Sequence, residues 1–434
     1  MAELGLIQAQ RPIIGGAADF DTLIRNFLLA SVFLLLWISF RPFEDLSEAL
    51  DIAAIGGTVA NQIGYSLLFV LLGAWCLFHE PRRLLFLIRP AFVALLFWIA
   101  LSVANSWEPS LSGRRFAFTM VAIGIAGMVL LVPRNLRQFS GVLAATVLAV
   151  LAACYYGVFF LPSLSVHQSS DFAEPLLAGD WRGVFGHKNG AGATMVLFVF
   201  IGLFVARQRN IFVGALIVVL AATFLVFTRS ATAIAMLPIT LVMSNLTARM
   251  RTPAAAVSLT LLVVLLLNLF SVGSIYFEPI RNLLGLILSD PSFTGRTQIW
   301  EFAIDALAKH PLTGYGFAAF WNTPEVIYGM NSTDVWANTA SHAHQGYLDL
   351  AITIGIPGAA LAALWLIVLP LIDFCRSPND PSLAPLKMLV LRVCLFAAYA
   401  SCFESMLMQE GELGLFFFTS VFALRLLSVS RLAA

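Results

Sequence analysis

Twelve long apolar runs divide this chain, and they constrain its fold more than any other feature. They lie at about residues 26–40, 62–78, 90–106, 116–132, 139–161, 190–206, 211–228, 231–246, 254–276, 345–372, 387–404 and 413–430. Runs of this length can cross a hydrocarbon core of about 30 Å as helices. Charged residues make up only 11% of the chain, whereas soluble domains carry about 25%. We therefore predict an all-α polytopic membrane protein with about 12 transmembrane helices, forming a single integral membrane domain over residues 1–434.

Lysine and arginine predict the orientation of the spans, because cytoplasmic loops carry an excess of both. If the N-terminus lies inside, most of the 25 Lys and Arg residues fall in inner segments. Both termini are then cytoplasmic, and the inner loops are short. The outer face has a loop at about 162–189 and a much longer one at 277–344. We expect any chemistry on this face, away from ATP and sugar nucleotides.

Composition also excludes several classes of function. A net charge of +1 without a basic arm gives no sign of nucleic-acid binding. The five cysteines are scattered and match neither a disulfide framework nor a metal motif, so we expect buried small side chains. The first apolar run, Asn26 to Phe40, has no small-residue cleavage site and is expected to remain as a span.

Four basic residues of the outer segments break the charge trend and lie close to span ends: Arg182, Lys188, Arg229 and Arg296. Any one of them alone is read as a solvated or snorkelling charge. Their occurrence on one face, next to two histidines, favours an anion site. Phosphate suits this site because the planar guanidinium binds two oxygens at once.

The sequence DWRGVFGHKNGAGA leads into the sixth span. If Asn189 or the glycines after it begin that helix, its free backbone N–H groups point at the same anion. The glycines Gly186, Gly190 and Gly192 either let a lipid phosphate approach closely or serve helix packing.

Residues 294–310 are predicted to form an amphipathic helix that lies along the outer membrane surface. Arg296 and Trp300 are four residues apart and share a face of it. The sequence HPLTGYGF ends the helix in a tight turn. Three aromatic residues nearby either stack on sugar faces or anchor the chain at the membrane interface: Tyr315, Trp321 and Trp336.

His342 and His344 precede the tenth span. A zinc site needs three or four ligands, and no cysteine or paired His and Glu accompanies this pair, so no metal is expected. Imidazole titrates near neutral pH and can take a proton from a hydroxyl. His344 is the candidate general base and His342 a supporting residue, although either also suits a helix cap.

The final outer turn, FESMLMQEGELG, carries Glu404, Glu410 and Glu412. Carboxylates there orient an imidazole, hold an acceptor sugar, or form a solvated turn. We select Glu410 as the supporting carboxylate.

Three segments together resemble a known family. His344, Gln345, Gly355 and Gly358 have the spacing H-Q-x9-G-x-x-G, which resembles the signature of the O-antigen ligase and Wzy-type polysaccharide polymerase superfamily. RGVFGHKN and TGRTQIW…HPLTGYGF are similar to two other family segments and occur in the same order. The layout of twelve spans with a large loop before the histidine helix is also similar.

The resemblance implies a metal-independent, inverting glycosyltransferase with a GT-C-like membrane fold and no cofactor. Its donor would be a glycan on undecaprenyl pyrophosphate, at the periplasmic face of the bacterial inner membrane. By the resemblance, His344 is the base, and Arg182 and Arg296 contact the pyrophosphate. Lys188 and Arg229 join them on the local charge argument, with Asn189, Gln345 and Trp300 as supporting residues.

Three functions remain open at this point. The sequence GHKN is closer to the exopolysaccharide polymerase branch of the family, whose members join lipid-linked repeat units, so it favours a polymerase. A chain-length regulator is then a further candidate partner. A ligase would instead transfer the glycan to lipid A-core or to a protein hydroxyl. A transporter or flippase is disfavoured because the chain lacks a sixfold repeat and has few ionisable residues inside its spans.

Overall fold

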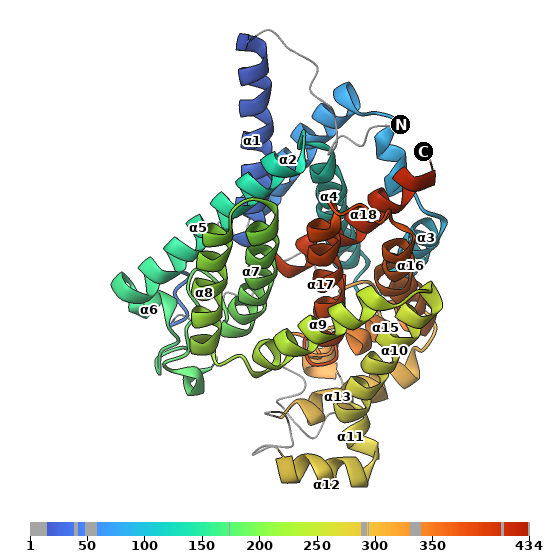
Figure 1. Cartoon of the computed structure of the whole chain (residues 1–434). Coiled ribbons are helices and arrows are strands. Elements are labelled where there is room, and N and C mark those ends of the chain that lie inside the picture. Colours follow the sequence, from blue (N-terminus) through green and yellow to red (C-terminus); the bar gives the residue numbers. More distant parts are fainter. Residues whose placement is uncertain are drawn as a thin grey trace.

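The computed structural model describes residues 15–38, 42–47, 59–172, 174–287, 293, 295–329, 340–408 and 412–432 (Figure 1). Throughout these ranges the regular elements are helices, apart from one isolated antiparallel bridge between Val166 and Trp181. The protein is therefore all-α and polytopic, as predicted.

The main helices follow one another in this order: α1 (Gly15–Trp37), α2 (Val59–His79), α3 (Pro90–Ala104), α4 (Pro109–Met128), α5 (Leu136–Phe160), α6 (Pro162–Ser165), α7 (Lys188–Gln208), α8 (Ile211–Thr228), α9 (Ala231–Arg249), α10 (Pro253–Phe270), α11 (Gly273–Tyr276), α12 (Glu278–Ile287), α13 (Arg296–Lys309), α15 (Gly346–Ala363), α16 (Leu369–Arg376), α17 (Ala384–Ala400) and α18 (Glu412–Leu432). A π-helical turn, Leu364–Val368, joins α15 to α16.

Each of the twelve predicted spans corresponds to a helix. In the described part of the chain, nine helical segments are long and apolar enough to cross a membrane. Two further apolar helices, α3 and residues 414–429 of α18, are shorter. The remaining predicted span is α17, which carries Lys387 and Arg392. The seventh and eighth spans are separate helices, since Arg229 between them adopts a left-handed conformation with φ 49°.

Local sequence signals set several helix starts. Proline stands at the beginning of α3, α4 and α10, where its missing N–H costs no hydrogen bond. Asn135, Asn210 and Thr252 cap α5, α8 and α10 by accepting hydrogen bonds from backbone N–H groups of the first turn.

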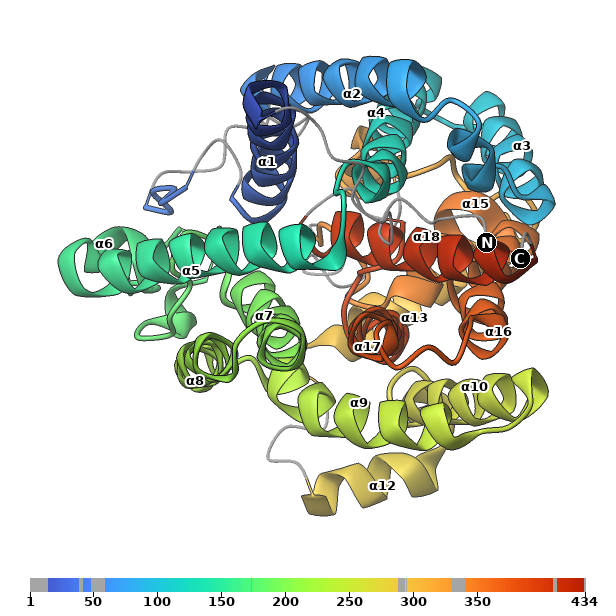
Figure 2. The same ribbon diagram turned by 45° about the horizontal axis from the view of Figure 1, so that its top comes forward.

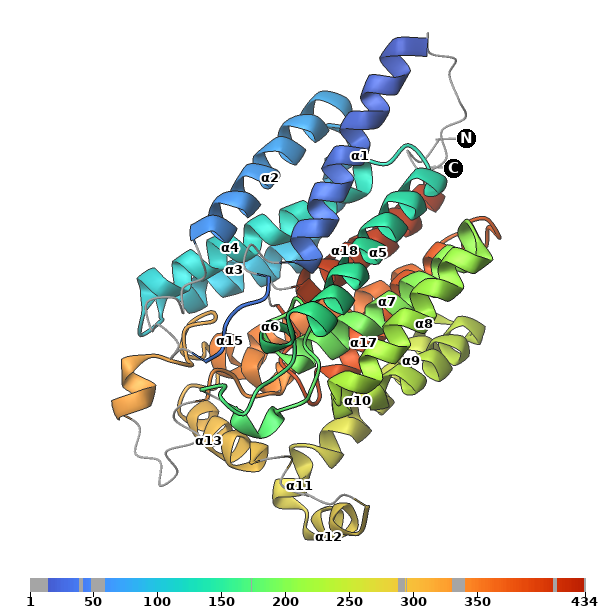
Figure 3. The same cartoon turned by 90° about the vertical axis from the view of Figure 1, so that its left-hand side faces the viewer.

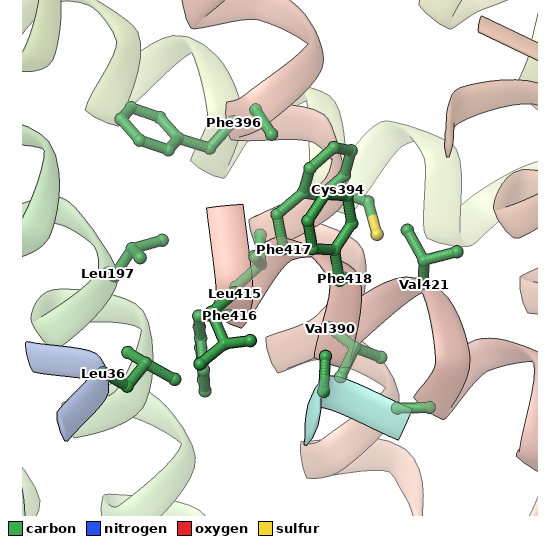
Figure 4. Packing of buried hydrophobic residues seen from close by; sticks show 14 of the residues in the cluster. Leu36, Leu197, Val390, Cys394, Phe396, Leu415, Phe416, Phe417, Phe418 and Val421 are labelled. Atoms are coloured by element: carbon green, nitrogen blue, oxygen red, sulfur yellow. The ribbon is translucent and has the colours of Figure 1, made fainter. Parts of the chain in front are cut away.

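The largest apolar core lies among the spans. α18 lies at the centre of the bundle, between α4 and α17 (Figure 2). Trp37 packs on Phe198 and Phe416, with ring centroids 4.9 and 5.1 Å apart, and so joins α1 to α7 and α18. Figure 4 shows side chains of α1, α7, α17 and α18 gathered in this core. Four of the five cysteines are buried, as expected.

α15 is broken at Gly355, whose φ of 72° and ψ of 169° lie outside the helical region. A Cβ there would lie 1.8 Å from the carbonyl oxygen of Leu312, so only glycine fits. The close approach is therefore to a loop and not to another helix. Gly358 does serve packing, because a Cβ there would lie 2.6 Å from the Trp98 ring of α3.

The HPLTGYGF loop pairs with the break in α15. The N–H groups of Tyr315 and Gly316 donate to the carbonyls of Ile352 and Thr353, at 2.9 and 3.0 Å. In return, the N–H of Ile356 donates to a carbonyl of the loop, that of Pro311, at 2.8 Å. The backbone groups that the break frees are thereby satisfied inside the membrane protein.

α11, α12 and α13 lie at one end of the bundle, opposite the start of α1 (Figure 1); we call this the α13 end. α13 confirms the predicted helix at 294–310, whereas its position along the membrane surface stays a prediction. Its apolar face packs against α15 (Figure 3) and forms a second core around Trp300. Tyr315 and Trp321 are buried in the same core, so neither presents its ring as a sugar platform or an interface anchor. Trp336 lies outside the described residues.

Candidate active site

Side chains from four separate segments meet at the α13 end. They are Asn189 in the first turn of α7, Arg296 at the start of α13, His342 and His344 before α15, and Glu404 in the turn after α17. Four of these five are predicted site residues, and Glu404 is their common centre.

The segment that carries His344 is held from both sides. The N–H of Gly346 donates to the carbonyls of Ser401 and Glu404 at 2.7 and 3.1 Å, which docks the start of α15 on the end of α17. On the other side, Trp300 Nε1 donates to the carbonyl of Ala343 at 2.8 Å. The predicted supporting residue Trp300 therefore fixes the backbone next to the candidate base.

Two polar side chains of the same region complete this support. Asp349 accepts hydrogen bonds from the N–H of Ala343 at 2.9 Å, from Trp321 Nε1 at 2.7 Å and from Ser405. Gln345 is buried, caps α15 through its side chain and donates to Asn268 of α10. With these contacts His344 is kept at φ 50°, a left-handed conformation that is uncommon for residues other than glycine.

His344 and Glu404 form an imidazole–carboxylate pair. His344 Nδ1 lies 3.2 Å from Glu404 Oε2, and the histidine side chain is 27% exposed. Since a carboxylate accepts, Nδ1 carries the proton of the neutral ring, which leaves Nε2 with a lone pair. This is the tautomer that a general base needs.

Glu404 is held by two further donors. Its Oε1 accepts from Arg296 Nη2 at 2.8 Å and from Asn189 Nδ2 at 3.2 Å. Burial raises the pKa of Glu404, but the hydrogen bond from His344 and the charge of Arg296 lower it by more, to about 2. Glu404 is therefore ionised at neutral pH, and it fixes a base and a cation side by side.

His342 packs edge-on against His344, with ring centroids 4.0 Å apart. Its Nδ1 accepts the backbone N–H of His344 at 3.2 Å, so the ring supports the loop. Burial and the neighbouring His344 lower the pKa of His342 to about 3, and the ring stays neutral at neutral pH.

The other predicted cations form a group beside this centre. Lys188 Nζ lies 2.6 Å from one oxygen of Asp180, and Arg229 Nη1 lies 3.3 Å from the other. The Arg229 side chain is 71% exposed and open to a ligand. Lys188 directly precedes Asn189, which donates to Glu404, and so links this cation group to the His344 centre.

Arg182 has a different environment from the other predicted cations. It is only 1% exposed and donates to the carbonyls of Phe185 and Glu44, at 3.0 and 2.5 Å. Its Nε has no partner within the described ranges. In the structure Arg182 organises the loop ahead of α7, and its contact with pyrophosphate stays a prediction.

The sequence reasoning selected a different carboxylate of the final turn. Glu410 lies outside the described residues, whereas Glu404 is the partner of His344. Glu404 was one of three carboxylates in one turn, and nothing in their spacing separates them. The roles of Asp349, Asp180, Glu174 and His187 were also missed, because loops bring them to their partners and no periodic spacing in the sequence reveals those contacts.

Comparison with known proteins supports the family resemblance. Residues 216–363 match the family model described as O-antigen ligase. The chain is also 24% identical over 243 residues to the exopolysaccharide production protein ExoQ of Rhizobium meliloti (strain 1021), covering 52% of each protein. The match thus spans about half the length of this curated relative. The segment from 216 to 363 contains Arg229, Arg296, His342 and His344. Residues 216–363 are therefore similar to the O-antigen ligase family, and the resemblance of the chain to the O-antigen ligase and Wzy-type polymerase superfamily is confirmed.

Proposed function

We propose that this protein is a membrane glycosyltransferase that polymerises oligosaccharide repeat units carried on undecaprenyl pyrophosphate. The α13 end would be the periplasmic face of the bacterial inner membrane, with both termini cytoplasmic. The observation that carries the proposal is the hydrogen-bonded group of His344, Glu404 and Arg296. It joins a proton acceptor to a cation, which are the two elements that glycosyl transfer from a pyrophosphate requires.

The reaction follows from the geometry of His344. Its Nε2 takes the proton of an acceptor hydroxyl while the hydroxyl oxygen forms a bond to the anomeric carbon of the donor. The bond from that carbon to the pyrophosphate breaks, and the pyrophosphate leaves with the electron pair. Attack opposite to the leaving group inverts the configuration. Glu404 stabilises the imidazolium that forms, as a carboxylate does in a catalytic triad.

Positive charge serves the leaving group. Arg296, Lys188 and Arg229 would face the pyrophosphate, with Arg182 buried behind them. Such fixed charges stabilise the developing negative charge in the transition state, a role that a metal ion plays in other enzymes. Since the lipid pyrophosphate carries the energy, the reaction requires no nucleotide.

The named relative favours a polymerase, since ExoQ is an exopolysaccharide production protein. The family description, O-antigen ligase, favours the second candidate, transfer of the glycan to lipid A-core or a protein hydroxyl. Both functions use the same donor site and differ in the acceptor.

One experiment separates the candidates. Purified protein in lipid nanodiscs is given a lipid-pyrophosphate oligosaccharide with and without lipid A-core, and the products are sized. Growing chains without added acceptor support the polymerase, and product only with lipid A-core supports the ligase. Lipid translocation without any glycosidic bond would overturn both. The His344→Ala protein should fold and form no product, whereas retained activity would remove His344 as the base.

A further inference from the structure

A second histidine–carboxylate pair lies beside the first. His187 Nε2 is 2.6 Å from Glu174 Oε2. His187 is also the N-cap of α7, where its Nδ1 accepts the N–H of Asn189 at 3.0 Å. Because Nδ1 accepts, Nε2 carries the proton and donates it to Glu174. Both ring nitrogens are thus used, and His187 serves to position the carboxylate.

The two pairs are connected through three consecutive residues. His187 holds Glu174, and Asn189 in the same turn donates to Glu404, the partner of His344. The hydrogen bond from His187 lowers the pKa of Glu174, burial opposes this, and the imidazoles of His187, His167 and His344 lower it further when they are protonated. Glu174 is therefore ionised at neutral pH and lies within the electrostatic range of the candidate base.

Glu174 has room for a ligand. Its side chain is 44% exposed, and Oε1 has no hydrogen-bond partner within the described ranges. The wall behind it is rigid: His167 is buried, bonds Asp171 at 2.8 Å and accepts the N–H of Lys188 at 3.3 Å. An ionised oxygen that is fixed in direction and open on one side suits a neutral donor such as a hydroxyl.

The negative charge of Glu174 favours binding of the acceptor sugar over binding of the pyrophosphate. A pyrophosphate would be repelled by Glu174, whereas Arg296 neutralises Glu404 and Lys188 neutralises Asp180. Sugar hydroxyls carry no charge and donate readily to carboxylates. The diphosphate would therefore be bound by the cations, and the acceptor hydroxyls by the open oxygen of Glu174.

Building on the proposed function, we propose that Glu174 and His187 form the subsite for the acceptor sugar. The free oxygen of Glu174 accepts a hydrogen bond from the hydroxyl next to the attacking one, which aims the attacking hydroxyl at His344 Nε2. Holding two neighbouring hydroxyls fixes the sugar ring and gives the reaction its orientation.

The test uses a soluble oligosaccharide acceptor without pyrophosphate, so that donor and acceptor are varied separately. Glu174→Gln should raise the KM of the acceptor about tenfold, because one charge-assisted hydrogen bond becomes a neutral one, and should leave the KM of the donor unchanged. Glu278→Gln, an exposed carboxylate of α12 at the same end, is the matched control and should behave as wild type. Equal acceptor KM values in the two variants would overturn the proposal.

A second acceptor that lacks the neighbouring hydroxyl gives a readout that a structural defect does not imitate. The kcat/KM of wild type should be about tenfold lower with this deoxy acceptor than with the full acceptor. The Glu174→Gln protein, which has already lost this contact, should have the same kcat/KM with both acceptors. Equal deoxy penalties in both proteins would refute the contact. His187→Asn keeps an N-cap but removes the donor to Glu174, and it should raise the acceptor KM by a smaller factor. If wild type forms no glycosidic bond at all, the proposed function fails; if it does and the acceptor KM is unmoved, only the subsite fails.

Discussion

The substitution Glu404→Gln tests the chemistry of the site most directly. Glu404 accepts from His344 at 3.2 Å, from Arg296 at 2.8 Å and from Asn189 at 3.2 Å. The amide has one acceptor oxygen and an NH2 group, so it must turn a donor toward either the imidazole or the guanidinium. It also removes the negative charge that stabilises the imidazolium after proton transfer.

We expect kcat to fall about a hundredfold. A hydrogen bond to a charged group contributes about 1.5–3 kcal/mol, and about 1.36 kcal/mol equals a factor of ten in rate. Losing the His344 contact in the transition state therefore costs between about tenfold and 150-fold. The upper part of this range applies, because the wrong amide orientation adds to the lost charge.

The assay measures initial rates of glycosidic bond formation with purified protein. Asn189→Ala is the matched control: it keeps the charge of Glu404 and the His344 contact, and the bond that it removes is made before and after proton transfer alike, so kcat should fall only about fivefold. Melting temperatures in detergent show whether both variants fold, and Arg296 keeps its bond to the carbonyl of Phe403 in both. A kcat for Glu404→Gln no lower than that for Asn189→Ala would refute the dyad.

Three further predictions concern the cations and His342. Arg296→Lys should lower kcat/KM more than tenfold, because lysine lacks the fork that holds Glu404 and the backbone together; a near-normal rate would make Arg296 a plain surface charge. Arg182→Gln should destabilise the protein by about 1.5–3 kcal/mol, since two carbonyls lose a charged donor; an unchanged melting temperature with weakened donor binding would instead place Arg182 at the pyrophosphate. The pKa of His342, about 3 when folded, lies below the value of about 6.5 for an unfolded histidine. As the pH is lowered, the unfolded chain therefore binds the proton before the folded protein does. The free energy of unfolding should decrease by up to about 1.4 kcal/mol for each pH unit between pH 6.5 and about 3. His342→Gln should flatten this acid limb in thermal unfolding, and an unchanged limb would contradict the assignment.

The sequence predicted the spans well because hydropathy reports them directly. The predicted boundaries of α8, 211 and 228, are those of the structure. The amphipathic pattern of α13 also predicted a helix, but an apolar face does not tell whether lipid or protein covers it. In the structure, protein covers this face, because Tyr315, Trp321 and neighbouring apolar residues form one core with Trp300. The break at Gly355 was missed for a similar reason, because its partner is a loop distant in sequence.

The three segments that resemble the family are all hydrogen-bonded to Glu404. RGVFGHKN contributes Asn189, TGRTQIW contributes Arg296, and the H-Q segment contributes His344; each donates to the same carboxylate. HPLTGYGF secures the broken helix that begins just after His344. Glu404 belongs to none of these segments. Its removal should therefore uncouple all three at once, and the combined loss in Glu404→Gln should change little when Asn189→Ala is added. Additive losses in that double variant would mean that Asn189 acts on the substrate itself, independently of the dyad.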